Sequence, residues 1–127
     1  MCNIFIPGTP RSSKNNKIWT GEYLIDSEAV QLYRKTTKQY WTDETLKNEF
    51  IEVFSKKHKP VKIYFHFVFN RNQRRDFHNF VQLPLDLMVE HGWIEDDRMD
   101  LILPYPLLIN KQAFHIDKLN PGTIIKL

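Results

Sequence analysis

The stretch VKIYFHFVFN, at residues 61–70, decides the fold. Its strongly apolar side chains occupy every second position, and this two-residue period is typical of a β-strand with one face in the core. The core face is expected to carry Ile63, Phe65, Phe67 and Phe69, and the opposite face Lys62, Tyr64, His66 and Val68. On that opposite face His66 is expected to have a cross-strand or solvent-facing role, so it is left out of the predicted site.

The segments before this strand carry both strand and helix signals. Pro7-Gly8 ends a short apolar run, Asp26 or Ser27 is a good helix cap, and Pro60 cannot continue a helix. The expected elements are a strand over 2–6, a strand pair over 18–25 around Thr20-Gly21, a helix from Asp26 or Ser27 to about Tyr40, and a second helix from a Thr42 cap to about Lys57.

The segments after the strand add one helix and further strands. A basic loop over 71–75 precedes a helix over 77–91, and Gly92 suits the end of that helix. Pro84 should kink or split the helix, at a cost of roughly 3 kcal/mol. Strands are expected over 101–103 and 123–127, with 107–110 as a further candidate. The sum is a single α+β domain over residues 1–127, a small mixed sheet with about three helices packed on it.

The composition fits one folded domain of a reducing compartment. Of the 127 residues, 42% are hydrophobic and 13% are aromatic, which argues against disorder. The single cysteine, Cys2, excludes an internal disulfide framework and a metal site of several cysteines. No apolar run is long enough to cross a bilayer, and the start of the chain lacks a signal-peptide pattern. We therefore expect a cytoplasmic protein that does not enter a membrane.

Cationic side chains gather in three places, although the net charge is only +3. Clustered cations are the usual feature of surfaces that bind phosphate backbones, and solvated loops without a partner are the alternative. The third cluster favours nucleic acid because it directly precedes Asp76, the first of the carboxylates considered below. The clusters are Arg11, Lys14 and Lys17; Lys56, Lys57 and Lys59; and Arg71, Arg74 and Arg75.

Two acidic motifs flank the helix over 77–91, RRDFHN at 74–79 and EDDRMD at 95–100. Fifteen helical residues from Asp76 to His91 rise about 22 Å, and six extended residues from His91 to Asp97 span about 20 Å. If the chain reverses at Gly92, Asp97 can therefore return close to Asp76.

Carboxylates brought together by folding repel one another unless a cation joins them, and Mg²⁺ prefers such oxygen ligands. His78 would add a nitrogen ligand and shift the preference toward Mn²⁺ or Zn²⁺. Each residue also has a simpler interpretation: Asp76 as a helix cap, Asp96-Asp97 as a solvated turn, and His78 as an exposed residue of the first turn.

These residues resemble a known family. The run at 74–79, a helix, and GWIEDD at 92–97 resemble the core of the RusA family of Holliday junction resolvases, which are common in phages and prophages. The opening IPGTPRSSKN at 6–15 and the closing NPGTII at 120–125 resemble the family's first strand with its basic loop and its last strand. The likeness covers the length of the chain, and its specific part is the stretch of about 22 residues from Asp76 to Asp97.

The resemblance implies a homodimeric α+β endonuclease that cuts four-way DNA junctions by symmetric nicks with Mg²⁺. Asp76 and Asp97 match metal-binding aspartates of the family, and Asn79 and Asp96 match their motif neighbours. The chain departs from the family at His78, where a second aspartate is expected, and at Gln82, where the helix carries a lysine. These changes permit either cleavage with a changed metal preference or junction binding without cleavage. We favour cleavage, because histidine is itself a metal ligand.

The favoured hypothesis is a metal-dependent nuclease acting on branched DNA, with Mg²⁺ or Mn²⁺ as its cofactor. A junction-binding protein without cleavage and a protein-interaction domain are the alternatives. The predicted catalytic residues are Asp76, His78 and Asp97, with Asp96 as an additional metal ligand, and the predicted DNA-binding residues are Arg11, Lys14, Lys17, Arg71, Arg74, Arg75 and Gln82.

Overall fold

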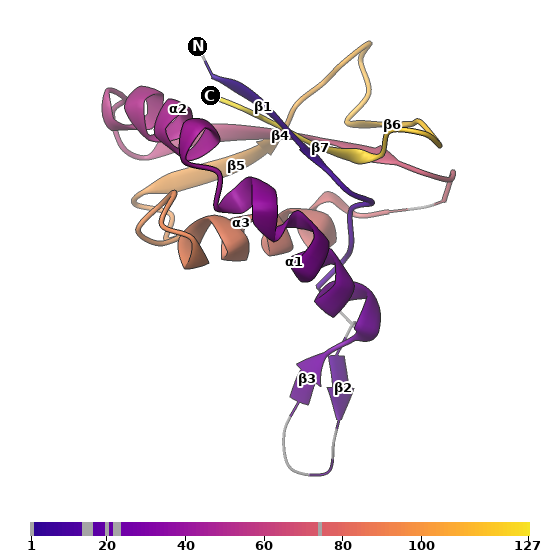
Figure 1. Ribbon diagram of the computed structural model, residues 1–127. Helices are drawn as coiled ribbons and strands as arrows, with labels where there is room; N and C mark the ends of the chain where they lie inside the picture. Colours follow the sequence, from indigo (N-terminus) through magenta and orange to yellow (C-terminus); the bar gives the residue numbers. More distant parts are fainter. Residues whose placement is uncertain (1, 14–16, 20, 22–23, 74) are drawn as a thin grey trace.

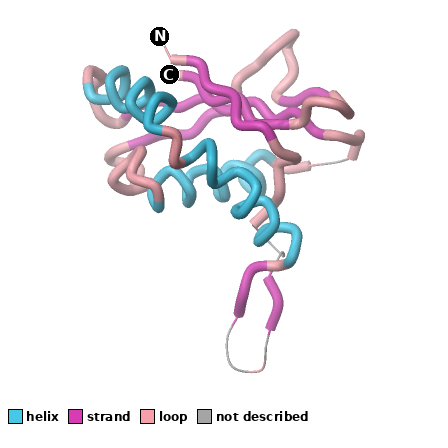
Figure 2. The backbone as a smooth tube through the Cα atoms, in the orientation of Figure 1, coloured by secondary structure: helices cyan, strands magenta, loops and turns pink. Residues whose placement is uncertain are grey.

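Strand β4 (Val61–Phe69) is an inner strand of the main sheet in the computed structural model, which describes residues 2–13, 17–19, 21, 24–73 and 75–127. The expected core face is confirmed, because Ile63, Phe65, Phe67 and Phe69 are all buried. Figures 1 and 2 show the sheet with the helices on one side of it and the segment between β5 and β6 on the other.

The main sheet is mixed, as expected. Strands β1 (Asn3–Pro7) and β4 both pair antiparallel with β7 (Gly122–Lys126), which lies between them. Strands β5 (Ile102–Pro106) and β6 (Phe114–Ile116) pair parallel with successive parts of β4, at Val61–Phe65 and Phe67–Phe69. The prediction of a strand over 107–110 was wrong. In that segment Ile109 forms an isolated bridge with Gln112, and β6 begins after it at Phe114.

Three helices cover the core face within the described residues. Helix α1 (Glu28–Trp41) begins at its cap Ser27, whose side chain accepts a hydrogen bond from the Val30 amide. Helix α2 (Glu44–Ser55) begins at Asp43 instead of Thr42, because the Asp43 carboxylate accepts from the Thr45 and Leu46 amides. Before α1, β2 (Lys17–Trp19) and β3 (Leu24–Asp26) form the expected strand pair. Within the residues described here, every helix is too short or too polar to span a bilayer.

Helix α3 (Phe77–Glu90) runs through Pro84 without being divided. The proline ring is buried, and its neighbours Leu83, Leu85 and Leu87 pack in the core. After the helix the chain reverses at Gly92, whose φ of +78° is a conformation that glycine adopts without strain. The predicted reversal is therefore confirmed, and it sends residues 93–100 back toward the helix.

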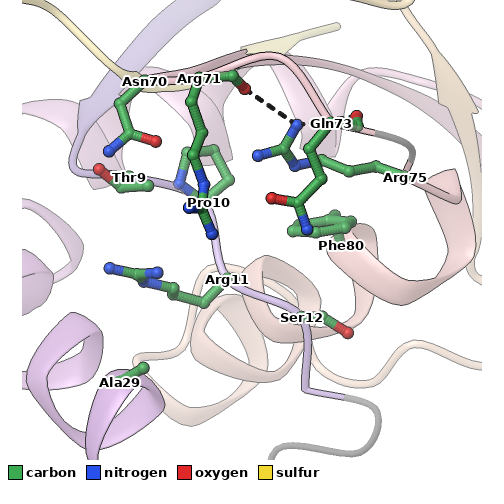
Figure 3. A pocket seen from close by; sticks show the side chains of 10 residues that line it. All are labelled: Thr9, Pro10, Arg11, Ser12, Ala29, Asn70, Arg71, Gln73, Arg75 and Phe80. Atoms are coloured by element: carbon green, nitrogen blue, oxygen red, sulfur yellow. Dashed lines mark hydrogen bonds between the residues drawn. The ribbon is translucent and has the colours of Figure 1, made fainter. Parts of the chain in front are cut away.

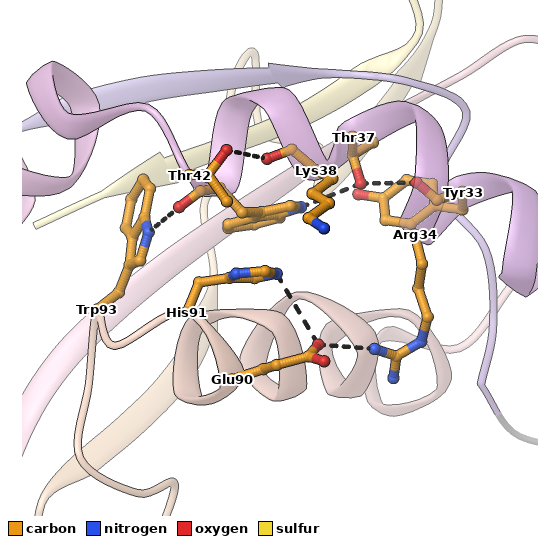
Figure 4. A network of polar contacts seen from close by, with 9 residues as sticks. Tyr33, Arg34, Thr37, Lys38, Thr42, Glu90, His91 and Trp93 are labelled. Atoms are coloured by element: carbon orange, nitrogen blue, oxygen red, sulfur yellow. Dashed lines mark hydrogen bonds and ion pairs between the residues drawn. The ribbon is translucent and has the colours of Figure 1, made fainter.

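Tryptophan 93 fixes this returning segment. Its indole nitrogen donates a hydrogen bond of 2.7 Å to the Trp41 carbonyl, and the two rings meet edge to face at 5.5 Å. Both tryptophans are fully buried. Figure 4 shows the hydrogen bond of the Trp93 indole and, at the other end of the view, the ion pair between Arg34 and Glu90, whose atoms lie 3.0 Å apart. The C-terminal end of α3 is thus tied to α1 by both apolar and charged contacts.

Histidine 66 is buried and not solvent-facing, but its role across strands is confirmed. Its Nε2 lies 2.8 Å from Nδ1 of His115 on β6, and its Nδ1 lies 2.9 Å from the Leu107 carbonyl. Since a carbonyl only accepts, Nδ1 of His66 carries a proton and donates it there. Burial is the main cause that lowers the pKa of His66. This histidine therefore holds the segment after β5 against the sheet and takes no part in the predicted site.

Candidate functional site

Three arginines meet in a surface pocket of 310 Å³ between the end of β1 and the segment that links β4 to α3. Figure 3 shows the guanidinium groups of Arg11, Arg71 and Arg75 around one space, with Asn70 and Gln73 beside them. The described residues that line this pocket include no carboxylate. A concave site with several guanidinium donors and no competing acid favours an anion such as a phosphate. Three predicted DNA-binding residues are therefore brought together.

Arginine 75 is held rigidly in this pocket. Its guanidinium lies over the Phe69 ring at 3.8 Å from the ring centre. One of its nitrogens, Nη1, donates to the carbonyls of Arg71 and Gln73 at 3.1 and 2.9 Å. Partial burial and, secondly, the nearby charge of Arg71 lower the pKa of Arg75. A bound anion would offset both effects, so the arrangement is prepared for negative charge.

The other predicted cations cannot be placed in this pocket. Lys14 and Arg74 lie outside the described residues, and so does the side chain of Lys17, although its backbone belongs to β2. Their predicted contacts with DNA stay predictions.

Aspartate 76 directly precedes α3 and has an exposed side chain. It is the cap residue by backbone position, but its carboxylate accepts no capping hydrogen bond from the helix. The simpler interpretation of Asp76 as a side-chain cap therefore does not hold. Asp76 follows Arg75 in the sequence, and both residues line a second hollow beside the arginine pocket.

Aspartate 97 returns to α3, as the chain geometry predicted, and meets the helix at Gln82. The Gln82 amide nitrogen donates to Oδ2 of Asp97 at 3.2 Å and to Oδ1 of Asp86 at 2.7 Å. Gln82 is thus half-buried between two carboxylates, where its amide neutralises no charge. The predicted role of Gln82 in binding DNA gains no support from this position.

Asp86 also lies beside the predicted site, although it is not among the predicted site residues. It lies one helical turn after Gln82, and its link to Asp97 through that residue places it at the edge of the predicted site. The four-residue spacing of Gln82 and Asp86 was the available signal, because residues at this spacing face the same side of a helix. His78 lies one turn before Gln82 on the same stripe, with an exposed side chain.

Aspartate 96 shapes the turn that carries Asp97. Its Oδ1 accepts from the Asp97 amide at 2.8 Å, and its Oδ2 lies 3.6 Å from the Arg98 guanidinium. These contacts agree with the interpretation of Asp96-Asp97 as a polar turn, and they orient Asp97 toward the helix.

The predicted ligands lie at the start of α3 and on the turn beside it, but they do not form one compact group. Across the described part of the chain, no set of three or more His, Cys, Asp and Glu side chains is placed to hold a metal ion. Gln82 follows Asp76 by six residues, or about 9 Å along the helix, so Asp97 lies beside the second turn and not the first. The oxygen donors suit Mg²⁺ by type, and a shared ion would require Asp76 and Asp97 to approach each other.

The sequence matches no family model and no curated protein. The candidate site consists of an arginine pocket, an aspartate before α3 whose side chain makes no capping bond, and a second aspartate held against the same helix.

Proposed function

We propose that the protein is a metal-dependent endodeoxyribonuclease that cuts four-way DNA junctions, in keeping with its resemblance to the RusA family. The observation that carries this proposal is the arginine pocket. One of its lining residues, Arg75, directly precedes Asp76 in the sequence. A backbone phosphate held in the pocket would bring the neighbouring phosphodiester to the carboxylates of α3 and of the returning turn.

The side chains have separate roles in this proposal. Arg11, Arg71 and Arg75 bind phosphate, and Arg75 is already fixed by its contacts with Phe69 and with backbone carbonyls. Asp76 and Asp97 would supply oxygen ligands to Mg²⁺ or Mn²⁺, with His78 as a nitrogen ligand. When bound, the ion polarises the phosphate and lowers the pKa of an attacking water.

Two further residues position these ligands. Gln82 holds Asp97 against the stripe of α3 that also carries His78, and Asp96 orients the turn. A homodimer would present two such sites, and its twofold symmetry would match two symmetric nicks in a junction. The proposal also includes the cytoplasm as the compartment in which the protein acts.

The decisive experiment follows nicking of a synthetic four-way junction with Mg²⁺ or Mn²⁺. Asp76→Asn and Asp97→Asn should each reduce nicking by about a hundredfold or more, while junction binding survives. Glu52→Gln is the matched control, because Glu52 is an exposed acid of α2 whose carboxylate pairs with Lys56 at 3.4 Å. Equal nicking by both aspartate variants and the control would overturn the assignment of the site.

A second function, junction binding without cleavage, is favoured by one observation. Gln82 occupies the position of the family's lysine and bonds to two carboxylates, which leaves no cation there. This alternative predicts salt-sensitive junction binding and no nicking with any divalent ion. Arg75→Gln should weaken binding and reduce the slope of log K against log salt by about one in either case. A protein without DNA or metal binding would instead be an interaction domain.

A further inference from the structure

A second hollow, of 190 Å³, lies beside the arginine pocket where α3 begins. Five phenylalanine side chains from three elements line it, together with Asp76 and Arg75. Phe67 and Phe69 are buried, whereas the other three rings are only half-buried. The rings are those of Phe67 and Phe69 on β4, Phe77 and Phe80 on α3, and Phe114 on β6.

This aromatic hollow is shaped by ring contacts that leave its centre open. Phe69 meets Phe80 at 5.1 Å and Phe114 at 5.8 Å, both edge to face, while Phe67 meets Phe77 at 6.0 Å. Aromatic walls facing an open space lose the contacts that a filled core provides. A flat ligand that displaces water from such walls binds favourably, by burial of apolar surface and by stacking.

The aromatic hollow and the arginine pocket adjoin, because Arg75 and Phe80 line both of them. One is cationic and the other apolar, so together they match a ligand with an anionic part and a flat part joined by a short link. We propose that the two hollows hold one unstacked nucleotide, with its phosphate among Arg11, Arg71 and Arg75 and its base among the phenylalanines.

Aspartate 76 favours a nucleobase over another aromatic group. Its exposed carboxylate lines the aromatic hollow and accepts no capping hydrogen bond from α3. Nucleobases carry N–H donors on their edges, which a carboxylate can accept, whereas the ring of a phosphotyrosine has none. A phosphotyrosine peptide, which also joins an aromatic ring to a phosphate, is therefore the weaker candidate and serves as a test.

The source of the nucleotide rests on the proposed function. In a branched DNA, a nucleotide at the crossover is the least costly to unstack, and its strand would then run on toward Asp97. The preference of the two hollows for a nucleotide does not itself require cleavage.

The first experiment titrates the metal-free protein with deoxyadenosine 5′-monophosphate, with deoxyribose 5-phosphate and with phosphotyrosine, by calorimetry. The nucleotide should bind about tenfold more tightly than the sugar phosphate, because base–aromatic stacking adds to affinity. Phe114→Leu should remove this advantage and leave sugar-phosphate binding unchanged, whereas Arg75→Gln should weaken both ligands.

The matched control is Phe54→Leu. Phe54 is also a half-buried ring that stacks on a buried one, Phe50 at 5.5 Å, but it lies on α2 away from the hollow. Circular dichroism checks that each variant is folded, and Phe77→Leu replaces Phe114→Leu if the latter is not. Equal affinity for the nucleotide and the sugar phosphate, or tighter binding of phosphotyrosine, would overturn the proposal.

The second experiment places 2-aminopurine at the crossover of a four-way junction, with EDTA present so that no strand is cut. Binding should raise its fluorescence with the wild-type protein and not with Phe114→Leu. Nicking of the junction with Mg²⁺, together with equal affinity for the nucleotide and the sugar phosphate, would refute this inference and leave the proposed function intact. Base preference in the mononucleotide titration without junction binding would refute the proposed function and the DNA source, and would identify free nucleotides as the ligand.

Discussion

The two ends of α3 are built in opposite ways. At the C-terminal end, Trp93 is buried against Trp41, and Glu90 pairs with Arg34 on α1. At the N-terminal end, Asp76 accepts no capping bond, and the surrounding rings and arginines enclose two open hollows. The difference indicates a division of labour, in which the packed end fixes the helix so that the open end can hold a ligand in a defined place.

Removing Trp93 from the packed end of α3 should lower the stability of the protein most strongly. Trp93→Ala removes a fully buried ring, so we expect the free energy of unfolding to fall by about 3–5 kcal/mol, measured by urea denaturation followed by circular dichroism. Trp93→Phe keeps most of the ring and loses only the donor to the Trp41 carbonyl, so it should cost less than the alanine variant. Equal stability of Trp93→Ala and wild type would mean that the C-terminal end is not the anchored one.

Asp43 caps α2 through its side chain, whereas Asp76 does not cap α3 in this way. This difference predicts a smaller change in stability, which distinguishes a structural aspartate from a functional one. Asp43→Ala removes a carboxylate that caps α2 with two hydrogen bonds and should cost about 1 kcal/mol. Asp76→Ala should change stability by less than about 0.5 kcal/mol, because no such bond is lost at α3. Thermal and chemical unfolding of the two variants side by side would show this contrast. A cost at Asp76 as large as that at Asp43 would assign Asp76 a structural role.

The smallest effect is expected at the charged contact of the packed end. Glu90→Gln removes the charged partner of Arg34. The Glu90 side chain is 56% exposed and that of Arg34 is 31% exposed, so the free energy of unfolding should fall by less than about 1 kcal/mol, and by less still as salt is added. Glu52→Gln, from a pair that is 72% exposed on both sides, should change nothing measurable. A larger loss at Glu90 would show that charge, and not the tryptophan pair, anchors α3.

The fold was largely predictable because its main elements carry strong periodic signals. The two-residue period of β4 and the caps around Ser27 and Gly92 are local, so each could be recognised from neighbouring residues alone. The short strand β6 was missed because only its pairing with β4 over three residues makes it a strand. The burial of His66 was missed for a related reason, since the residues that cover it come from the distant segment at 107–115.

The path of the chain around the candidate site was predictable in part. The return of Asp97 to α3 followed from chain lengths, whereas its contact with Gln82 depends on how the turn at Asp96 packs. The aromatic hollow could not be foreseen, because Phe80 and Phe114 each look like ordinary core residues in the sequence. A space between side chains from separate elements leaves no local pattern.

The place of β7 in the sheet has a consequence for the order in which the chain folds. This strand follows every other element along the chain, yet it lies between β1 and β4 and provides the ladder that joins them. During synthesis, β1 therefore waits unpaired until residues 122–126 leave the ribosome. Such distant pairing slows folding, and a chain that stops before β7 exposes two strand edges that other chains can pair with.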